Sequence, residues 1–273
     1  MPLVLLTAVL ILLYWPALQE FLYDWWHDDN YSHGFLIPVI SGYLLWKKRD
    51  KIKAIEKQGH WAGLIFIIAG LGLTVLGTAA AEWYSVRFSM ILVLLGLVLF
   101  LAGPKMFKET WFPIVFLIFA IPLPYTIFRT LTFPLQLFST KVTYVLATNL
   151  GVTALRQGNI ILLPNYSLEV VEACSGLRSI IVLSALAAIY SYMISGGVLK
   201  KTTLFLMAIP IAIFANIVRL MITVFGAQII GKEFAEGFLH ELSGLVVFLT
   251  GLFLFFLTEK LFSRMTKVKL VHH

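Results

Sequence analysis

Long apolar runs separated by short charged clusters dominate this sequence. Spanning a bilayer takes roughly 20 mostly apolar residues, and paired or tilted segments can be shorter. The second and fifth runs are short and contain Pro38 and Pro113, which are typical of kinked or re-entrant segments. We therefore predict an all-α polytopic membrane protein with about eight transmembrane helices, over residues 2–22, 31–46, 61–81, 88–102, 111–124, 175–194, 202–220 and 240–257.

Residues 125–149 follow a different pattern. Their apolar side chains recur at steps of three and four, and polar residues and Pro134 interrupt them. This pattern predicts a broken amphipathic helix at the extracytoplasmic interface. Residues 159–163 and 167–171 are β-prone and flank a turn signal, so we expect a short β-hairpin after this helix.

Composition supports a membrane protein. Hydrophobic residues make up 60% of the chain, charged residues 13%, and the mean hydropathy is +0.91, which together exclude an ordinary soluble domain. The net charge of +7 lies in clusters between apolar runs, so we expect membrane lipid as a partner and no nucleic acid. The first run lacks a basic flank and a cleavage site, and we expect a retained helix. We treat residues 1–271 as one integral membrane domain and His272–His273 as a candidate tag remnant.

Basic residues set the expected orientation. With the N-terminus inside, 14 of the 21 Lys and Arg residues lie in cytoplasmic segments, whereas ten of the 14 acidic residues lie outside. An excess of Lys and Arg marks the cytoplasmic side. Eight spans would then place both termini in the cytoplasm.

Cys174 is the single cysteine, and it lies where the sixth run begins, in Glu172-Ala173-Cys174-Ser175-Gly176-Leu177-Arg178. One cysteine excludes an intrachain disulfide. A thiol at a helix N-terminus is biased toward the reactive thiolate, and Arg178, one turn further on, could add to that bias or bind a carboxylate. The alternative is that Cys174 is a small packing residue between helices.

Arg219 and His240 are the other candidates for chemistry. Arg219 follows Asn216 by three residues in an apolar run, where an arginine is costly unless it is functional or snorkels to the interface. His240 opens the last run and can change protonation near neutral pH, although it could equally be a loop histidine. The expected topology puts Cys174, Arg219 and His240 at one outer level on three helices. Such a layout is typical of nucleophilic acyl transfer.

The outer polar cluster at residues 24–33 is a weaker candidate. His27, Asp28, Asp29 and His33 could ligate a metal, but their spacing fits no tight ligand motif. Its Trp and Tyr residues are typical of an interfacial aromatic belt. We therefore expect no metal and no cofactor.

On these motifs the chain resembles the exosortase/archaeosortase family of membrane-embedded cysteine transpeptidases, over essentially its whole length. The matching features are the Cys174 motif, Asn216-x-x-Arg219, His240 at a helix start, and the amino-terminal Tyr31-Ser32-His33-Gly34, followed by Pro38 and Trp46-Lys47-Lys48-Arg49. The histidine at position 240 looks more like the bacterial exosortases than the archaeal branch.

The resemblance implies a bacterial inner-membrane enzyme, exopolysaccharide-associated, that processes exported proteins. Their carboxy-terminal signal would combine a Pro-Glu-Pro-type motif, a transmembrane helix and a basic tail. Cys174 would be the nucleophile that forms a thioester, His240 the general acid/base, and Arg219 the stabiliser of the oxyanion or thiolate. The acyl group would pass to a cell-surface acceptor that the sequence does not identify. The motifs add four supporting candidates, Arg178, Glu172, Asn216 and His33.

The main alternative is a membrane transport or lipid-binding protein in which Cys174 is structural and Arg219 and Arg178 line a cavity. A third hypothesis is a catalytically inactive membrane scaffold in which Cys174 is a packing residue. The sequence shows no internal repeat, and its ionisable residues gather at one interface, which disfavours a transporter. A serine intramembrane protease is disfavoured because no Gly-x-Ser-x-Gly nucleophile site is evident.

Overall fold

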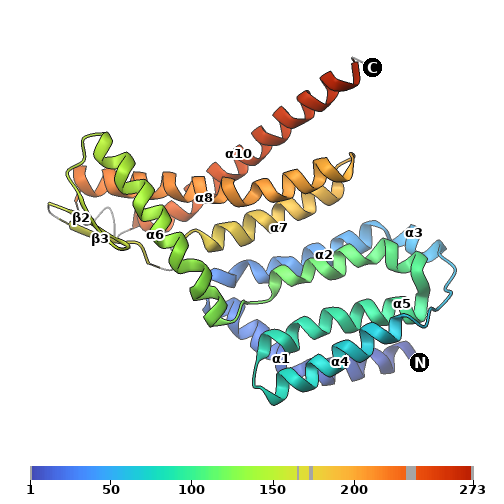
Figure 1. Cartoon of the computed structure of the whole chain (residues 1–273). Helices are drawn as coiled ribbons and strands as arrows, with labels where there is room; N and C mark the ends of the chain where they lie inside the picture. Colours follow the sequence, from blue (N-terminus) through green and yellow to red (C-terminus); the bar gives the residue numbers. More distant parts are fainter. Residues whose placement is uncertain (1, 165, 172–174, 232–237, 272–273) are drawn as a thin grey trace. The chain divides into compact units, whose positions relative to one another are not determined.

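The computed structural model describes residues 2–164, 166–171, 175–231 and 238–271. The chain forms two compact units, Met1–Pro124 and Tyr125–His273. Figure 1 shows that both units are built mainly from helices, with a small sheet in the second. The single membrane domain expected from the sequence stays a prediction.

The first unit contains five α-helices and two short 3-10 helices. Helix α5 leaves helical geometry at Gly103, whose φ is +83°, directly before Pro104. Glycine tolerates this left-handed conformation and proline cannot continue the hydrogen-bond ladder, so α5 consists of two arms, 83–102 and 104–116. The elements are α1 (Pro2–His27), η1 (Asp29–Phe35), α2 (Leu36–Lys47), α3 (Arg49–Ala54), α4 (Gly63–Ala79), α5 (Trp83–Phe116) and η2 (Leu117–Ala120).

Three glycines at seven-residue spacing allow α4 to pack closely against the first arm of α5. A Cβ added at Gly63 would collide with the backbone of Phe100, and one at Gly70 would lie 2.6 Å from Val93 Cγ2. At Gly77 it would lie 2.9 Å from Val86 Cγ2. Small residues are what allow helix backbones to approach each other in a membrane protein.

Buried hydroxyls add a polar connection between α1, α4 and α5. The Tyr14 hydroxyl lies 3.0 Å from Thr74 Oγ1 and 3.1 Å from Ser89 Oγ, and the last two oxygens are 2.8 Å apart. All three side chains are buried, so each satisfies the others where no water is present. This network fixes the register of the three helices.

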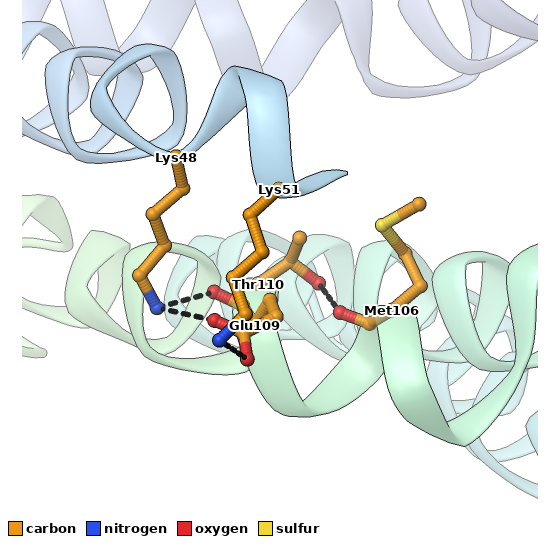
Figure 2. A network of polar contacts seen from close by, with 5 residues as sticks. All are labelled: Lys48, Lys51, Met106, Glu109 and Thr110. Carbon is orange, nitrogen blue, oxygen red and sulfur yellow. Dashed lines mark hydrogen bonds and ion pairs between the residues drawn. The ribbon is translucent and has the colours of Figure 1, made fainter. Parts of the chain in front are cut away.

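The second arm of α5 is tied to α2 and α3. Ser41 Oγ donates to the carbonyl of Pro113 at 2.6 Å. Figure 2 shows Lys48 and Lys51 converging on Glu109, with Nζ to carboxylate distances of 2.9 and 2.6 Å. We call this three-residue network the Glu109 clamp.

In its described residues, the second unit contains four α-helices and a three-stranded antiparallel sheet of order β1-β2-β3. Leu163 pairs with Tyr166 across the β2–β3 turn, and Leu155 pairs with Leu162. The buried face of the sheet packs on Val224 and Ala227. The elements are α6 (Tyr125–Asn149), β1 (Leu155–Gln157), β2 (Ile160–Leu163), β3 (Tyr166–Glu169), α7 (Leu177–Met193), α8 (Val198–Ile229) and α10 (Phe238–Val271).

Helices α7 and α10 pack against α8. The shared core comprises Leu183, Ala187, Ala208, Ile211, Ala212 and Phe255. A Cβ at Gly251 would lie 3.5 Å from Leu183 Cδ2 and 4.0 Å from Ala215 Cβ, so α10 approaches both helices closely at this glycine. The order of the contacting residues shows that α7 and α10 each run antiparallel to α8.

The structure confirms a mostly helical chain with a small sheet. Four helices in the described part of the chain are long and apolar enough to cross a bilayer: Val4–His27, Trp83–Ala120, Val198–Ile229 and Gly244–Phe262. Gly63–Ala79 and Leu177–Met193 are shorter apolar helices. The expected number of about eight spans is therefore not confirmed and stays a prediction, as does the orientation.

The predicted elements of the second unit are largely confirmed. Residues 125–149 form a helix with the predicted bounds, but it is continuous and not broken. Phe128, Thr132 and Gln136 are buried on both sides of Pro134, so packing holds the helix together across the proline. The predicted hairpin corresponds to β2 and β3, and β1 was not predicted.

Gly63→Ala should destabilise the first unit by about 1–3 kcal/mol, because its methyl group would press on backbone atoms that cannot move aside. Gly72 lies on the same helix with nothing within 4 Å of an added Cβ, so Gly72→Ala should be neutral or slightly stabilising. Thermal unfolding of both variants in detergent measures the difference. Equal melting temperatures would contradict the close helix packing.

Candidate functional site

A tight turn leads into α7. Cys174 and Glu172 lie outside the described residues, and the description resumes at Ser175, the residue directly after Cys174. Ser175 is 2% exposed, and its hydroxyl oxygen accepts a hydrogen bond from the Leu177 amide at 3.3 Å. Gly176 then takes a left-handed φ of +91°, which side-chain-bearing residues rarely adopt. The turn at the start of α7 is thus well defined.

This turn rests on α8 at Asn216. A Cβ added at Gly176 would lie 3.2 Å from Cβ, Cγ and Nδ2 of Asn216. Asn216 is fully buried. A glycine is required here for two reasons, its backbone conformation and the closeness of the asparagine side chain.

The chain before Cys174 also contacts α8. Val170, directly after β3, is fully buried and forms a cluster with Leu220. Its amide donates to the Asn159 carbonyl at 2.9 Å, which holds the end of the sheet in place. The two described flanks of the Cys174 segment therefore contact α8 at Leu220 and Asn216, one helical turn apart.

Arg219 lies within that turn of α8. Its side chain is half-buried, and its carbonyl accepts a hydrogen bond from Thr223 Oγ1 at 3.1 Å. The helix is one of the four candidate membrane spans. A cation in such a helix is costly in the absence of a polar or charged partner, so Arg219 remains a candidate for chemistry.

His240 is the third residue of α10, and its side chain lies outside the described residues. Because α10 is antiparallel to α8 and contacts it at Ala215 through Gly251, the start of α10 points toward the end of α8 that carries Arg219. The start of α7 lies at that end too, through Gly176. The structure thus gathers the starts of α7 and α10 and the Arg219 turn at one end of the three-helix group.

The remaining predicted residues differ in setting. Arg178 is exposed on the first turn of α7. His33 belongs to the first unit, where its Nε2 lies 3.1 Å from the carbonyl of Phe119. That carbonyl only accepts, so Nε2 carries the proton. This hydrogen bond joins η1, which contains His33, to η2, and the supporting role of His33 in chemistry stays a prediction.

Two neighbours reinforce the connection from α1 and η1 to the η2 region. The Trp25 indole donates to the Ala120 carbonyl at 2.9 Å, and the Tyr31 hydroxyl accepts from the Leu123 amide at 3.0 Å. The sequence motif around His33 thus has a structural function within the first unit.

The outer polar cluster is used in local contacts. Asp28 Oδ1 accepts from the Asn30 amide at 2.9 Å, and His27 Nδ1 lies 2.9 Å from the Tyr23 carbonyl. Among the described residues, no group of three or more His, Cys, Asp or Glu side chains is arranged to hold a metal ion.

The sequence analysis missed one buried ion pair. Arg87, 4% exposed, lies 2.7 Å from Asp24 and stacks over the Phe21 ring at 4.8 Å. Arg87 directly precedes the apolar run 88–102, and Asp24 follows the run 2–22. Their opposite charges at the ends of two apolar runs could have suggested the pair. The pair links α1 to α5 within the first unit.

Gly176→Ala should lower stability by more than Gly151→Ala. Both glycines have φ near +90°, so both variants lose about 1–2 kcal/mol to the left-handed conformation. Only Gly176 has a neighbour, because nothing lies within 4 Å of a Cβ at Gly151. Thermal unfolding measures the loss of stability in both variants, and the difference between them reports the Asn216 contact. Equal losses of stability would contradict that contact.

The comparisons with known proteins can now be set beside this geometry. A family model described as transmembrane exosortase (Exosortase_EpsH) matches residues 25–257, which include the Gly176 turn, the Arg219 turn and the start of α10. No curated protein and no solved structure matches the chain. Since the match covers far more than half of the sequence, this chain belongs to the transmembrane exosortase family.

Proposed function

We propose that the chain is a membrane cysteine transpeptidase that cleaves a carboxy-terminal sorting signal from exported proteins. Cys174 is the nucleophile, His240 the general acid/base and Arg219 the stabilising cation. Family membership supports the reaction class. The observation that carries the residue assignment is the anchoring of both flanks of the Cys174 segment on the one turn of α8 that contains Arg219.

Covalent geometry supports the pairing of Cys174 with Arg219. Two consecutive Cα–Cα steps of 3.8 Å span at most about 7 Å, so Cys174 stays close to Gly176, which contacts Asn216. Arg219 is one turn from Asn216 on the same helix, and its side chain is long. A guanidinium at this distance, together with the N-terminus of α7, favours the thiolate over the thiol.

The chemistry balances without a cofactor. The thiolate attacks the scissile carbonyl, and Arg219 neutralises the developing oxyanion. The C–N bond breaks, His240 gives its proton to the leaving amine, and a thioester remains. An amine of the acceptor then attacks the thioester, His240 takes its proton, and the thiolate is released. The acceptor is a primary amine at the cell surface.

The substrate class follows from the family resemblance and the membrane setting. We propose exported proteins whose carboxy-terminal signal joins a Pro-Glu-Pro-type motif to a transmembrane helix and a basic tail. The site then faces the extracytoplasmic side of the bacterial inner membrane, with both termini of the enzyme in the cytoplasm. The excess of Lys and Arg in the opposite segments supports this orientation.

Cys174→Ala should abolish shortening of a co-expressed, tagged substrate that carries such a signal, because no other cysteine can replace the thiol. Arg219→Ala and His240→Ala should each lower processing at least about 100-fold, the usual effect of losing a stabilising or proton-transferring group. Gel mobility of the substrate is the readout. Ser167→Ala, at an exposed position on β3, is the control and should process normally. Normal processing by Cys174→Ala would instead favour the transport or lipid-binding alternative.

Arg219→Gln should slow alkylation of the single cysteine by iodoacetamide about tenfold at pH 7 and move the rate profile to higher pH, because the guanidinium favours the thiolate. Arg219→Lys should retain most of the rate. Lys141→Gln removes an exposed charge elsewhere in the same unit and should change nothing. An unchanged rate profile in Arg219→Gln would show that Arg219 does not stabilise the Cys174 thiolate, whatever the substrate is.

A further inference from the structure

A strongly basic surface lies at one end of the first unit. Residues 47–57 and 105–109 together contain eight cations and three carboxylates, an excess of five positive charges. The cations are Lys47, Lys48, Arg49, Lys51, Lys53, Lys57, Lys105 and Lys108. We call them together the basic surface.

Specific contacts assemble this surface from two separate stretches of sequence. The Glu109 clamp joins the start of α3 to the second arm of α5 (Figure 2). The loop after α3 contacts the bend of α5, because the His60 amide donates to the Leu99 carbonyl at 3.1 Å and the Gln58 carbonyl lies against Gly103. Residues 47–57 and Lys105 and Lys108 are therefore held beside one another.

Most of these cations are available for a ligand. Glu109 is engaged by Lys48 and Lys51, and Arg49 lies 3.9 Å from Asp50. The five that remain are exposed and form no ion pair with another described residue: Lys47, Lys53, Lys57, Lys105 and Lys108. Five like charges held on one surface repel each other unless an anion neutralises them.

Aromatic side chains border the basic surface. Trp46 is 59% exposed at the end of α2, with the Arg49 guanidinium 4.4 Å from its ring centroid, and Trp61 is 69% exposed just before α4. Exposed tryptophans beside apolar helices are typical of the membrane interface at headgroup level. The apolar face of α2 continues from Trp46 through exposed Tyr43 and Val39.

We propose that the basic surface binds the headgroups of anionic phospholipids. The lysines are complementary in charge to the lipid phosphates. The tryptophans fit the boundary between headgroups and acyl chains, and a free anion would make no use of them. The surface lies in the unit that does not contain Cys174, Arg219 or His240. The proposal is therefore independent of the proposed function and concerns the lipids that bind to the first unit.

The test compares two triple variants of the full-length protein, delipidated in nonionic detergent. Lys53→Gln, Lys57→Gln and Lys105→Gln remove three cations of the basic surface and leave the Glu109 clamp intact. Lys141→Gln, Lys201→Gln and Lys260→Gln remove the same charge from the second unit. Phosphatidylglycerol and phosphatidylcholine retained per protein are measured by native mass spectrometry, and unfolding temperatures verify that both triples fold.

Wild type should retain phosphatidylglycerol over phosphatidylcholine, and the first triple should bind phosphatidylglycerol at least about tenfold more weakly, since each basic residue near a membrane surface contributes roughly fivefold. The Lys→Arg version of that triple should restore binding, and the second triple should behave as wild type. Equal losses in both triples would overturn the proposal, as would equal retention of the two lipids. Displacement of phosphatidylglycerol by millimolar inorganic phosphate would also overturn it, because it would indicate a free-anion site.

Discussion

The contact between Gly176 and Asn216 is the constraint on which the candidate site depends. It requires a residue without a side chain at a left-handed position, and it brings the start of α7 onto a fully buried asparagine of α8. One turn further along α8, Leu220 receives Val170 from the sheet. The described residues on both sides of the Cys174 segment thus contact one turn of α8, and the proposed pairing of Cys174 with Arg219 is built on these two contacts.

In the first unit, the helices have to pack without a hydrophobic driving force, because lipid tails are as apolar as the side chains that they contact. Its three glycines let α4 and α5 approach closely, and its polar side chains find partners inside the helical group. The hydroxyls of Tyr14, Thr74 and Ser89 satisfy one another, and Arg87 pairs with Asp24. In the same unit, the Glu109 clamp and the bond from the His60 amide to the Leu99 carbonyl hold lysines from two stretches of sequence on one surface.

Local sequence patterns predicted most helices and strands, but they did not predict the contacts between them. The 125–149 helix and the hairpin around Pro164 followed from periodicity and turn residues, whereas β1, only three residues long, carried no pattern of its own. Arg219 and Asn216 stood out because polar groups in apolar runs are costly. Val170 and Gly176 did not, because their importance lies in what they touch on α8. Cys174, Glu172 and the His240 side chain lie outside the described residues and stay predictions.

A disulfide between position 174 and the Arg219 turn tests the central claim most directly. Arg219→Cys adds a second cysteine to the chain, and mild oxidation followed by peptide mass spectrometry detects an intramolecular bond, which requires Cα atoms about 4.4–6.8 Å apart. Phe214→Cys, exposed on α8 five residues earlier, is the matched control. We predict rapid bond formation with Cys174 in Arg219→Cys and little in Phe214→Cys. No bond in Arg219→Cys, or equal bonding in both, would contradict the placement of the nucleophile beside Arg219.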